Sequence, residues 1–183
     1  MTSTWMGGLM GLQQNFFEIF GLRPGFAVDR SRLAARYREL QRQFHPDKYA
    51  AHSDREQMLA MQYAARINEA HNTLRDPVAR AAYLLQLAGV EMGPDQTTSD
   101  AAFLMQQMAL RERLEEIPAA PDPTAALRAL EQEVQALRAA DEECFARGYS
   151  GGDLPAARDS LLRLQFLAKL QRQVEELEED LLD

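Results

Sequence analysis

Cysteine and histidine are scarce in this 183-residue chain, and that scarcity limits its chemistry. The one cysteine, Cys144, excludes an internal disulfide framework and a cysteine-rich metal site, as is typical of a reducing compartment. The three histidines are His45, His52 and His71. We therefore expect no metal site and no cofactor in the chain itself, and any metal or cluster chemistry must be held by a partner.

Long apolar runs are also lacking, since no stretch approaches the ~20 residues that a membrane-spanning helix needs. Residues 1–14 include Trp5 and Leu9 but neither lysine nor arginine. This stretch therefore lacks the basic start of a secretory signal and the arginines of an organelle-targeting peptide. We expect it to be a frayed tail, and we expect a cytoplasmic protein with no membrane partner.

A net charge of −8 conceals an uneven distribution along the chain. Residues 1–90 carry 11 basic and 8 acidic side chains, whereas residues 91–183 carry 9 basic and 20 acidic ones. Two halves of opposite charge predict two surfaces with different partners. The basic residues are not interleaved with aromatic ones and the whole chain is acidic, so no nucleic-acid partner is expected.

What the chain does contain is two amphipathic helical segments on either side of His45-Pro46-Asp47. The upstream stripe has the 4, 3, 4 spacing of a helix: Leu33, Tyr37, Leu40 and Phe44. Downstream, the capping-box pattern from Ser53 to Glu56 opens a second helix. Its stripe is Leu59, Tyr63, Ile67, Ala70 and Leu74. Such helices bury their stripes against each other as an antiparallel hairpin, which places the tripeptide in a loop at the exposed tip.

Capping residues, prolines and glycines delimit the other elements. We expect a short helix over 15–20, the hairpin helices from the N-cap Asp29 to about 44 and over 54–75, and a fourth helix beginning at Pro77. Gly89 and the Gly93-Pro94 pair mark a boundary. Beyond it, helices over about 100–117, 124–146 and 155–182, with short connections, predict an antiparallel three-helix bundle. No strand pattern is present, so the predicted class is all-α.

The motifs along the hairpin resemble those of the J domain, the module that stimulates the ATPase of seventy-kilodalton heat-shock chaperones. They occur in order: Gln41-Arg42-Gln43-Phe44, His45-Pro46-Asp47-Lys48, Ile67-Asn68-Glu69-Ala70, Leu74-Arg75-Asp76-Pro77 and Arg80-Ala81-Ala82-Tyr83. Alone, the tripeptide is equally compatible with an ordinary turn. The resemblance implies a J domain over 15–88. Its implied chaperone-binding residues are His45, Pro46, Asp47, Arg36, Arg42 and Lys48.

Segment 100–117 has more apolar residues than one core face can use. At about 100° per residue, one sector forms the core stripe: Phe103, Leu110, Leu114 and Ile117. The opposite side carries Met105 and Met108 with Glu112 and Glu116, while Leu104 lies on the flank. Flexible methionine side chains in an exposed patch suit adaptable binding. Leu162 and Phe166 form a similar pair off the main stripe of their helix. The alternative is that these residues pack beneath the J domain or close the bundle.

A second resemblance favours binding. Five motifs resemble the C-terminal domain of the HscB-type co-chaperones: Ala102-Phe103-Leu104-Met105, Leu110-Arg111-Glu112, Leu114-Glu115-Glu116-Ile117, Leu164-Gln165-Phe166-Leu167 and Leu177-Glu178-Glu179. In that family the domain holds the IscU-type iron–sulfur cluster scaffold. The implied scaffold-binding residues are Leu104, Met105, Met108, Glu112, Glu116 and Phe166. Ala109 replaces an acidic residue of the bacterial pattern. The N-terminal CxxC pair of mitochondrial relatives is missing, which favours a bacterial origin.

Together the resemblances imply a J domain over 15–88, a linker over 89–98 and a scaffold-binding three-helix bundle over 99–183. The implied protein is not an enzyme. It delivers the scaffold to a specialised HscA-type chaperone, stimulates that chaperone's ATPase and promotes cluster transfer. The alternative is a general J-domain co-chaperone that delivers unfolded clients. A hydrolase built on His45 and Asp47 would need a pocket and a third polar group, which an exposed hairpin tip does not offer.

Overall fold

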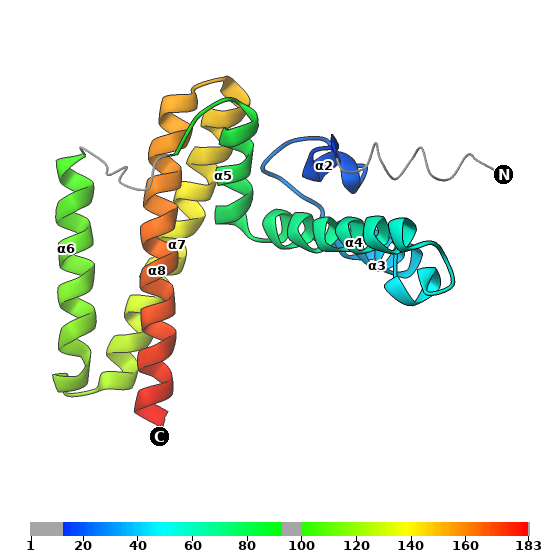
Figure 1. Cartoon of the computed structure of the whole chain (residues 1–183). Helices are drawn as coiled ribbons and strands as arrows, with labels where there is room; N and C mark the ends of the chain where they lie inside the picture. Colours follow the sequence, from blue (N-terminus) through cyan, green and yellow to red (C-terminus); the bar gives the residue numbers. More distant parts are fainter. Residues whose placement is uncertain (1–12, 93–99, 183) are drawn as a thin grey trace. The chain divides into compact units, whose positions relative to one another are not determined.

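A computed structural model of the chain describes residues 13–92 and 100–182, and all regular structure within these ranges is helical (Figure 1). The predicted all-α class is confirmed. The chain divides into two compact units, Met1–Tyr83 and Leu84–Asp183. Most of the expected N-terminal tail, residues 1–12, and much of the expected linker, residues 93–98, lie outside the described residues.

The N-terminal unit contains the predicted helical hairpin. Its elements are α2 (Phe16–Ile19), α3 (Arg30–Gln43), η1 (Pro46–Tyr49), α4 (Asp54–Arg75) and the first part of α5 (Pro77–Leu87). Helices α2 and α3 and the turn η1 all pack against α4. The core includes Phe17, Leu33, Ile67 and Leu74, each at most 1% exposed. Burying such side chains contributes ~1.5–3 kcal/mol each and holds the hairpin closed.

Three capping interactions set where these helices begin. Asp29 accepts a hydrogen bond from the Arg32 backbone N–H (3.0 Å), as predicted. The predicted capping box at the start of α4 is also present, because Ser53 Oγ accepts from the Glu56 N–H and the Glu56 carboxylate accepts from the Ser53 N–H. A similar box, not predicted, opens α2 at Asn15. Caps satisfy backbone groups that the first helical turn leaves unpaired.

The tip of the hairpin differs from the predicted loop, because Pro46–Tyr49 form one turn of 3₁₀ helix. Proline is favoured at the first position of a helix, since its fixed φ suits the turn and it has no N–H to leave unpaired. The two compact units meet inside a helix. The division falls within α5, between Tyr83 and Leu84.

The C-terminal unit contains the predicted antiparallel three-helix bundle. Its elements are the end of α5, α6 (Ala101–Glu116), η2 (Ile117–Ala119), α7 (Pro123–Gly151) and α8 (Leu154–Leu182). Helices α7 and α8 form a long hairpin, and α6 packs against both. One buried cluster joins the three helices: Leu110, Ile117, Leu127, Leu130, Val134, Leu167, Leu170 and Val174. In the described residues, no helix is long and apolar enough to cross a membrane.

Helix α7 is longer than predicted, because Gly148 does not end it. A Cβ at Gly148 would lie 3.0 Å from the backbone nitrogen of Ala157, so glycine here permits a close approach of α7 and α8. The helix ends at Gly152, whose φ of +77° places it in the left-handed region that favours glycine. Helix α7 thus continues through Gly148 and Gly151, beyond its predicted end near residue 146.

Candidate functional site

The hairpin tip, defined here as His45–Ala50, has a shape set by its own backbone contacts. His45 Nδ1 accepts a hydrogen bond from the Asp47 N–H (3.3 Å), and the Lys48 N–H donates to the His45 carbonyl (3.0 Å). The same Nδ1 lies 3.5 Å from the Asp47 carboxylate, and that carboxylate is 90% exposed.

Contacts of the hairpin tip and of the residues beside it join this region to α4. Gln57 Nε2 donates to the carbonyls of Ala50 (3.3 Å) and His52 (3.0 Å). Phe44 packs its ring edge-on against Tyr63, with 4.3 Å between centroids, and burial raises the pKa of the Tyr63 hydroxyl. Sequence reasoning did not single out Gln57. Its place one position after the capping-box glutamate, directly downstream of the loop, is the signal that could have identified it.

The predicted basic residues lie in three different settings. Arg36 pairs with Glu39 (2.7 Å). Arg42 lines a groove of about 800 Å³ between α3 and α4, together with His45 and two residues that sequence reasoning missed, Arg38 and Gln41. Lys48 is exposed at the hairpin tip. Two of the three predicted cations are thus available to a partner, while the third already has an anionic neighbour.

A polar network joins α3 to α4 beside this groove. The Tyr37 hydroxyl donates to Asn68 Oδ1 (2.9 Å), and Gln41 Nε2 donates to the Tyr37 oxygen (2.6 Å). The Tyr37 ring stacks on His71, with 3.8 Å between centroids and 10° between planes. Burial, with a smaller contribution from Arg75, lowers the pKa of His71. Uncharged and stacked, His71 helps to hold the two helices in register.

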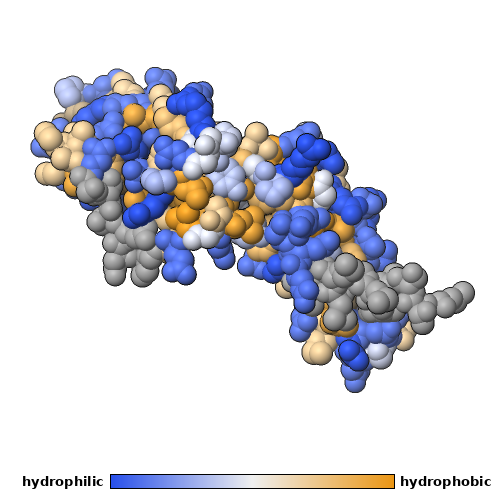
Figure 2. All heavy atoms as spheres, turned by 90° about the horizontal axis from the view of Figure 1, so that it is seen from above, coloured by the Kyte–Doolittle hydropathy of each residue, from blue (hydrophilic) through white to orange (hydrophobic). Residues whose placement is uncertain are grey.

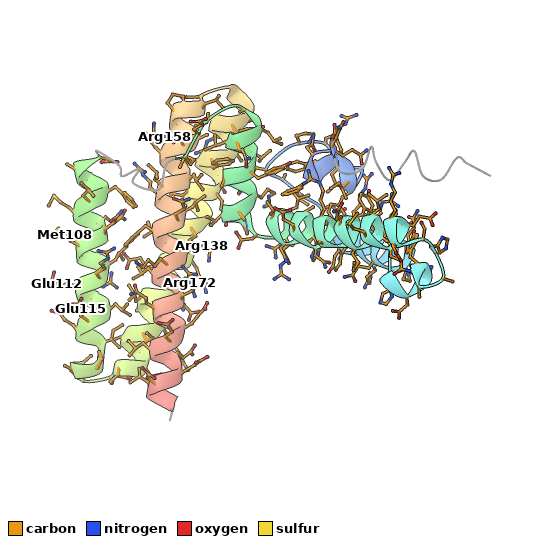
Figure 3. The ribbon with its side chains drawn as sticks, in the orientation of Figure 1. Met108, Glu112, Glu115, Arg138, Arg158 and Arg172 are labelled. Carbon is orange, nitrogen blue, oxygen red and sulfur yellow. The ribbon has the colours of Figure 1, made fainter. Side chains whose placement is uncertain are left out.

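The second surface, the α6 outer face, is defined here as Leu104, Met105, Met108, Glu112 and Glu116. Met105 and Met108 are 72% and 71% exposed, and Leu104 is 42% exposed. Met108 and Glu112 point away from α7 and α8 (Figure 3). Pale-orange apolar atoms are visible at the left edge of Figure 2, where α6 lies. The predicted exposure of these apolar residues is confirmed; their role stays a prediction.

Phe166 differs from its prediction as an exposed anchor. It is partly buried and packs against the core cluster of the bundle. Its ring meets Phe103 of α6 edge-on, with 5.8 Å between centroids. Because the side chain lies between α8 and α6, we expect its replacement to weaken the packing of the bundle. Only part of its surface is available to a partner.

The start of α6 is fixed by charged groups. Asp100 caps the helix by accepting from the N–H groups of Ala102 (3.0 Å) and Phe103 (3.2 Å). Arg163 of α8 pairs with Asp100 (2.5 Å) and lies 3.9 Å from Asp141 of α7. Burial raises the pKa of Asp141, and Arg163 partly offsets this increase. These contacts hold the end of α6 that carries Leu104.

Within residues 13–92 and 100–182, no group of three or more histidine, cysteine, aspartate and glutamate side chains is placed to hold a metal ion. Cys144 is exposed, with its Sγ 3.2 Å from an Arg147 guanidinium nitrogen. The hairpin tip and the α6 outer face both carry exposed charged groups, and the α6 outer face also carries exposed apolar ones.

Comparison with known proteins gives matches for both units. The DnaJ domain family matches residues 15–83, and the family described as the HSCB C-terminal oligomerisation domain matches residues 99–175. The co-chaperone protein HscB homologue of Vibrio vulnificus (strain YJ016) is 44% identical over 168 residues, covering 91% of this chain and 98% of the relative. The homologue of Aeromonas hydrophila is 42% identical over 170 residues, covering 92% of this chain and 99% of the relative.

Solved structures agree with these matches. The chaperone HscB from Vibrio cholerae superposes with a TM-score of 0.86 at 43% identity, covering 92% of this chain and 99% of that one. Human co-chaperone HscB gives a TM-score of 0.84 at 26% identity, covering 90% of this chain and 82% of the human one. The two matched domains, together with the exposed His45 and Asp47 of the hairpin tip, define a J-domain co-chaperone, a protein that works with a seventy-kilodalton heat-shock chaperone. Within that class the chain belongs to the HscB family, the co-chaperones of iron–sulfur cluster biogenesis.

Proposed function

We propose that this protein binds an IscU-type cluster scaffold on the α6 outer face and delivers it to an HscA-type chaperone. The observation that carries the proposal is the exposure of Met105 and Met108 on a helix whose opposite side is buried in the bundle core. A helix that needed only to close the bundle would have no use for two exposed methionines beside a leucine. In this proposal a J domain over 15–88, a linker over 89–98 and a bundle over 99–183 divide the two tasks.

At the other surface, the hairpin tip docks on the chaperone ATPase. The exposed carboxylate of Asp47 pairs with a cation there, and a charge-assisted contact of this kind is stronger than a neutral one. Arg42 and Lys48 accelerate the encounter with an acidic chaperone surface. Arg36 contributes less, because Glu39 already neutralises it. Docking shifts the chaperone toward its hydrolysing conformation, so ATP turnover is coupled to capture of the delivered scaffold.

The protein makes and breaks no covalent bond in this proposal and works in the bacterial cytoplasm. Its contribution is to hold two partners on one chain, which raises the effective concentration of each for the other. Cluster transfer from the scaffold to acceptor proteins is the process that benefits. The bonds of ATP are cleaved on the chaperone, and the cluster is held by the scaffold.

Titration calorimetry of the full chain with purified scaffold tests the first half of this proposal. Saturable binding that Met108→Ala weakens supports it, and the exposed Met58 of α4 provides a matched control variant, Met58→Ala. The second half is tested by the chaperone's ATP hydrolysis rate with the chain alone and with the chain plus scaffold. Binding of heterogeneous unfolded proteins, with none of the folded scaffold, would instead support a general co-chaperone.

A further inference from the structure

Four side chains of α6 and α8 form an array of contacts, with two aromatic rings in the middle and an arginine at each end. Arg163 lies over the ring of Phe103 (5.4 Å to the centroid), and Phe103 meets Phe166 edge-on (5.8 Å). Arg111 in turn lies over the ring of Phe166 (5.3 Å). Successive members of this array come from α8 and α6 in turn, and it runs from the partly buried Arg163 to the exposed Arg111.

The two arginines of this array differ in their anionic partners. Arg163 is paired with two carboxylates, those of Asp100 and Asp141. Arg111 is exposed, and within the described part of the chain its guanidinium has no ion pair or hydrogen bond. Glu115 follows it by four positions, the spacing at which helical side chains commonly pair. The Arg111 guanidinium lies over Phe166 instead, and Glu115 points outward (Figure 3).

The position of Arg111 over the Phe166 ring leaves its N–H donors available to a partner. These donors form a planar fork that matches a carboxylate. Because the ring already restricts the side chain, less conformational entropy is lost when that fork is bound. Arg111 follows Leu104 by seven positions and Met108 by three, so it lies on the same side of α6 as both.

We propose that Arg111, which lies over the ring of Phe166, is a further scaffold-binding residue and that the scaffold presents a carboxylate to it. This inference rests on the proposed function, since it identifies a contact within the same interface. The carboxylates of the α6 outer face, Glu112 and Glu116, repel an acidic group on the partner, whereas Arg111 attracts it. One cation beside several anions therefore favours a single orientation of the scaffold on the helix.

The role of Phe166 follows from the same geometry. Its ring is partly buried and its outer surface lies beneath the Arg111 guanidinium. Phe166 thus acts as a positioning residue: it holds Arg111 in the orientation that the scaffold carboxylate requires. Removing the ring should weaken scaffold binding beyond the loss of its own contact, because Arg111 is then released to pair with Glu115.

The test is calorimetric titration of the full-length protein and its variants with purified scaffold. Arg111→Gln removes the charge and should weaken binding by about tenfold or more, the change expected for loss of a charge-assisted contact. Arg111→Lys keeps the charge without the planar fork and should fall between Arg111→Gln and the wild-type protein. Arg172→Gln makes the same charge change at an exposed position of α8 and should bind like the wild-type protein (Figure 3). Thermal melting of all three variants should match the wild-type protein.

Salt dependence supplies a second measurement. The wild-type affinity should fall with added salt more steeply than that of Arg111→Gln, because that variant lacks the charged contact. Equal affinity and equal salt slopes for Arg111→Gln and the wild-type protein would overturn the inference. So would equal losses in Arg111→Gln and Arg172→Gln, which would show an effect of net charge alone. If Met108→Ala still weakens binding in either case, the proposed function stands, whereas a wild-type protein that binds no scaffold refutes the proposed function itself.

Discussion

The backbone N–H of Asp47 is hydrogen-bonded to Nδ1 of His45 at 3.3 Å, while the Asp47 carboxylate stays 90% exposed. The two residues thus have separate tasks within one turn. His45 sets the shape of the turn through its ring nitrogen, and Asp47 presents an exposed charge to solvent. Shape and charge at the hairpin tip can therefore be altered independently.

Asp47→Asn should abolish most stimulation of the chaperone ATPase without changing the fold. The amide has nearly the shape of the carboxylate, and the backbone hydrogen bond to His45 is retained, so thermal melting should not change. A charge-assisted contact is worth ~1.5–3 kcal/mol, so half-maximal stimulation should require at least about tenfold more protein. Glu69→Gln, which removes an exposed carboxylate from α4, should stimulate normally. Normal stimulation by Asp47→Asn would rule out the proposed role of this carboxylate.

Gln57→Ala should weaken docking while leaving Asp47 in place. The variant loses two hydrogen bonds, to the carbonyls of Ala50 and His52, each worth ~0.5–1.5 kcal/mol. The hairpin tip then samples more conformations before docking, so the half-maximal concentration for ATPase stimulation should rise while the maximal rate stays unchanged. Gln62→Ala, at an exposed position of the same helix, is the control. A lowered maximal rate would show that Gln57 does more than hold the tip.

Association with the chaperone should slow with added salt. Because Arg36 has an anionic neighbour and Arg42 lines the groove, the two residues should contribute to this salt dependence by different amounts. Exposed charges are screened beyond ~8 Å at physiological ionic strength. Arg42→Gln should flatten the dependence of the association rate on salt, as measured by stopped-flow fluorescence. Arg36→Gln should flatten it less, because Glu39 already neutralises Arg36 (2.7 Å). Equal flattening by the two variants would show that the pair with Glu39 does not persist in solution.

The stacked pair of Tyr37 and His71 predicts a pH dependence of stability. Burial and Arg75 lower the pKa of His71 below its ordinary value of 6.5, so the unfolded chain binds this proton more readily than the folded chain. The contribution of neutral His71 to the free energy of unfolding should therefore be fully present above pH 6.5. It should be lost as the pH falls through the lowered pKa. His71→Phe keeps a stacked ring without a titrating group, so its unfolding free energy should fall less between about pH 7 and about pH 5 in denaturant titrations. Parallel profiles would contradict the prediction.

A second group titrates in a different range, so the two effects can be separated. Hydrogen bonds from Ser53 lower the pKa of Glu56 below its ordinary value of 4.5. The stability that this carboxylate contributes is present above that value and is lost only as pH falls further through the lowered pKa. The decline due to His71 begins near 6.5 and should be measurable before that of Glu56 begins.

Periodicity and capping predicted most of the fold because both are local. Asp29, Ser53 and Pro77 each occupy the predicted position at a helix start, since a cap is decided by the few residues around it. Gly148 shows the limit of such reasoning. Its role depends on the proximity of Ala157 across the α7–α8 hairpin, and a contact between two helices is not visible in the local sequence.

The candidate sites show the same division between local and long-range information. The exposure of Met105 and Met108 follows from helical geometry alone, because the opposite side of α6 carries the core stripe. Phe166 was predicted to be exposed, since it lies off the main stripe of its own helix, but it packs against Phe103 of another. The network of Tyr37 and Asn68 likewise joins residues 31 positions apart, which no short motif records.

Two variants of the proposed scaffold-binding residues should differ in thermal stability, because Phe166 is packed on the core and the α6 side chains are exposed. The triple variant Leu104→Ala, Met105→Ala and Met108→Ala removes side chains that are 42%, 72% and 71% exposed, so it should melt close to the wild-type protein. Phe166→Ala instead removes a ring packed on the core, where truncation of large side chains costs up to ~3–5 kcal/mol for full burial, so it should melt at a lower temperature. Both should bind scaffold weakly, because apolar anchors dominate interface energies. In the absence of scaffold, both full-length variants should still stimulate the ATPase through their J domain. Only the additional stimulation that scaffold produces should be lost. A triple variant that melts as early as Phe166→Ala would show that the methionine face packs within the protein rather than against a partner.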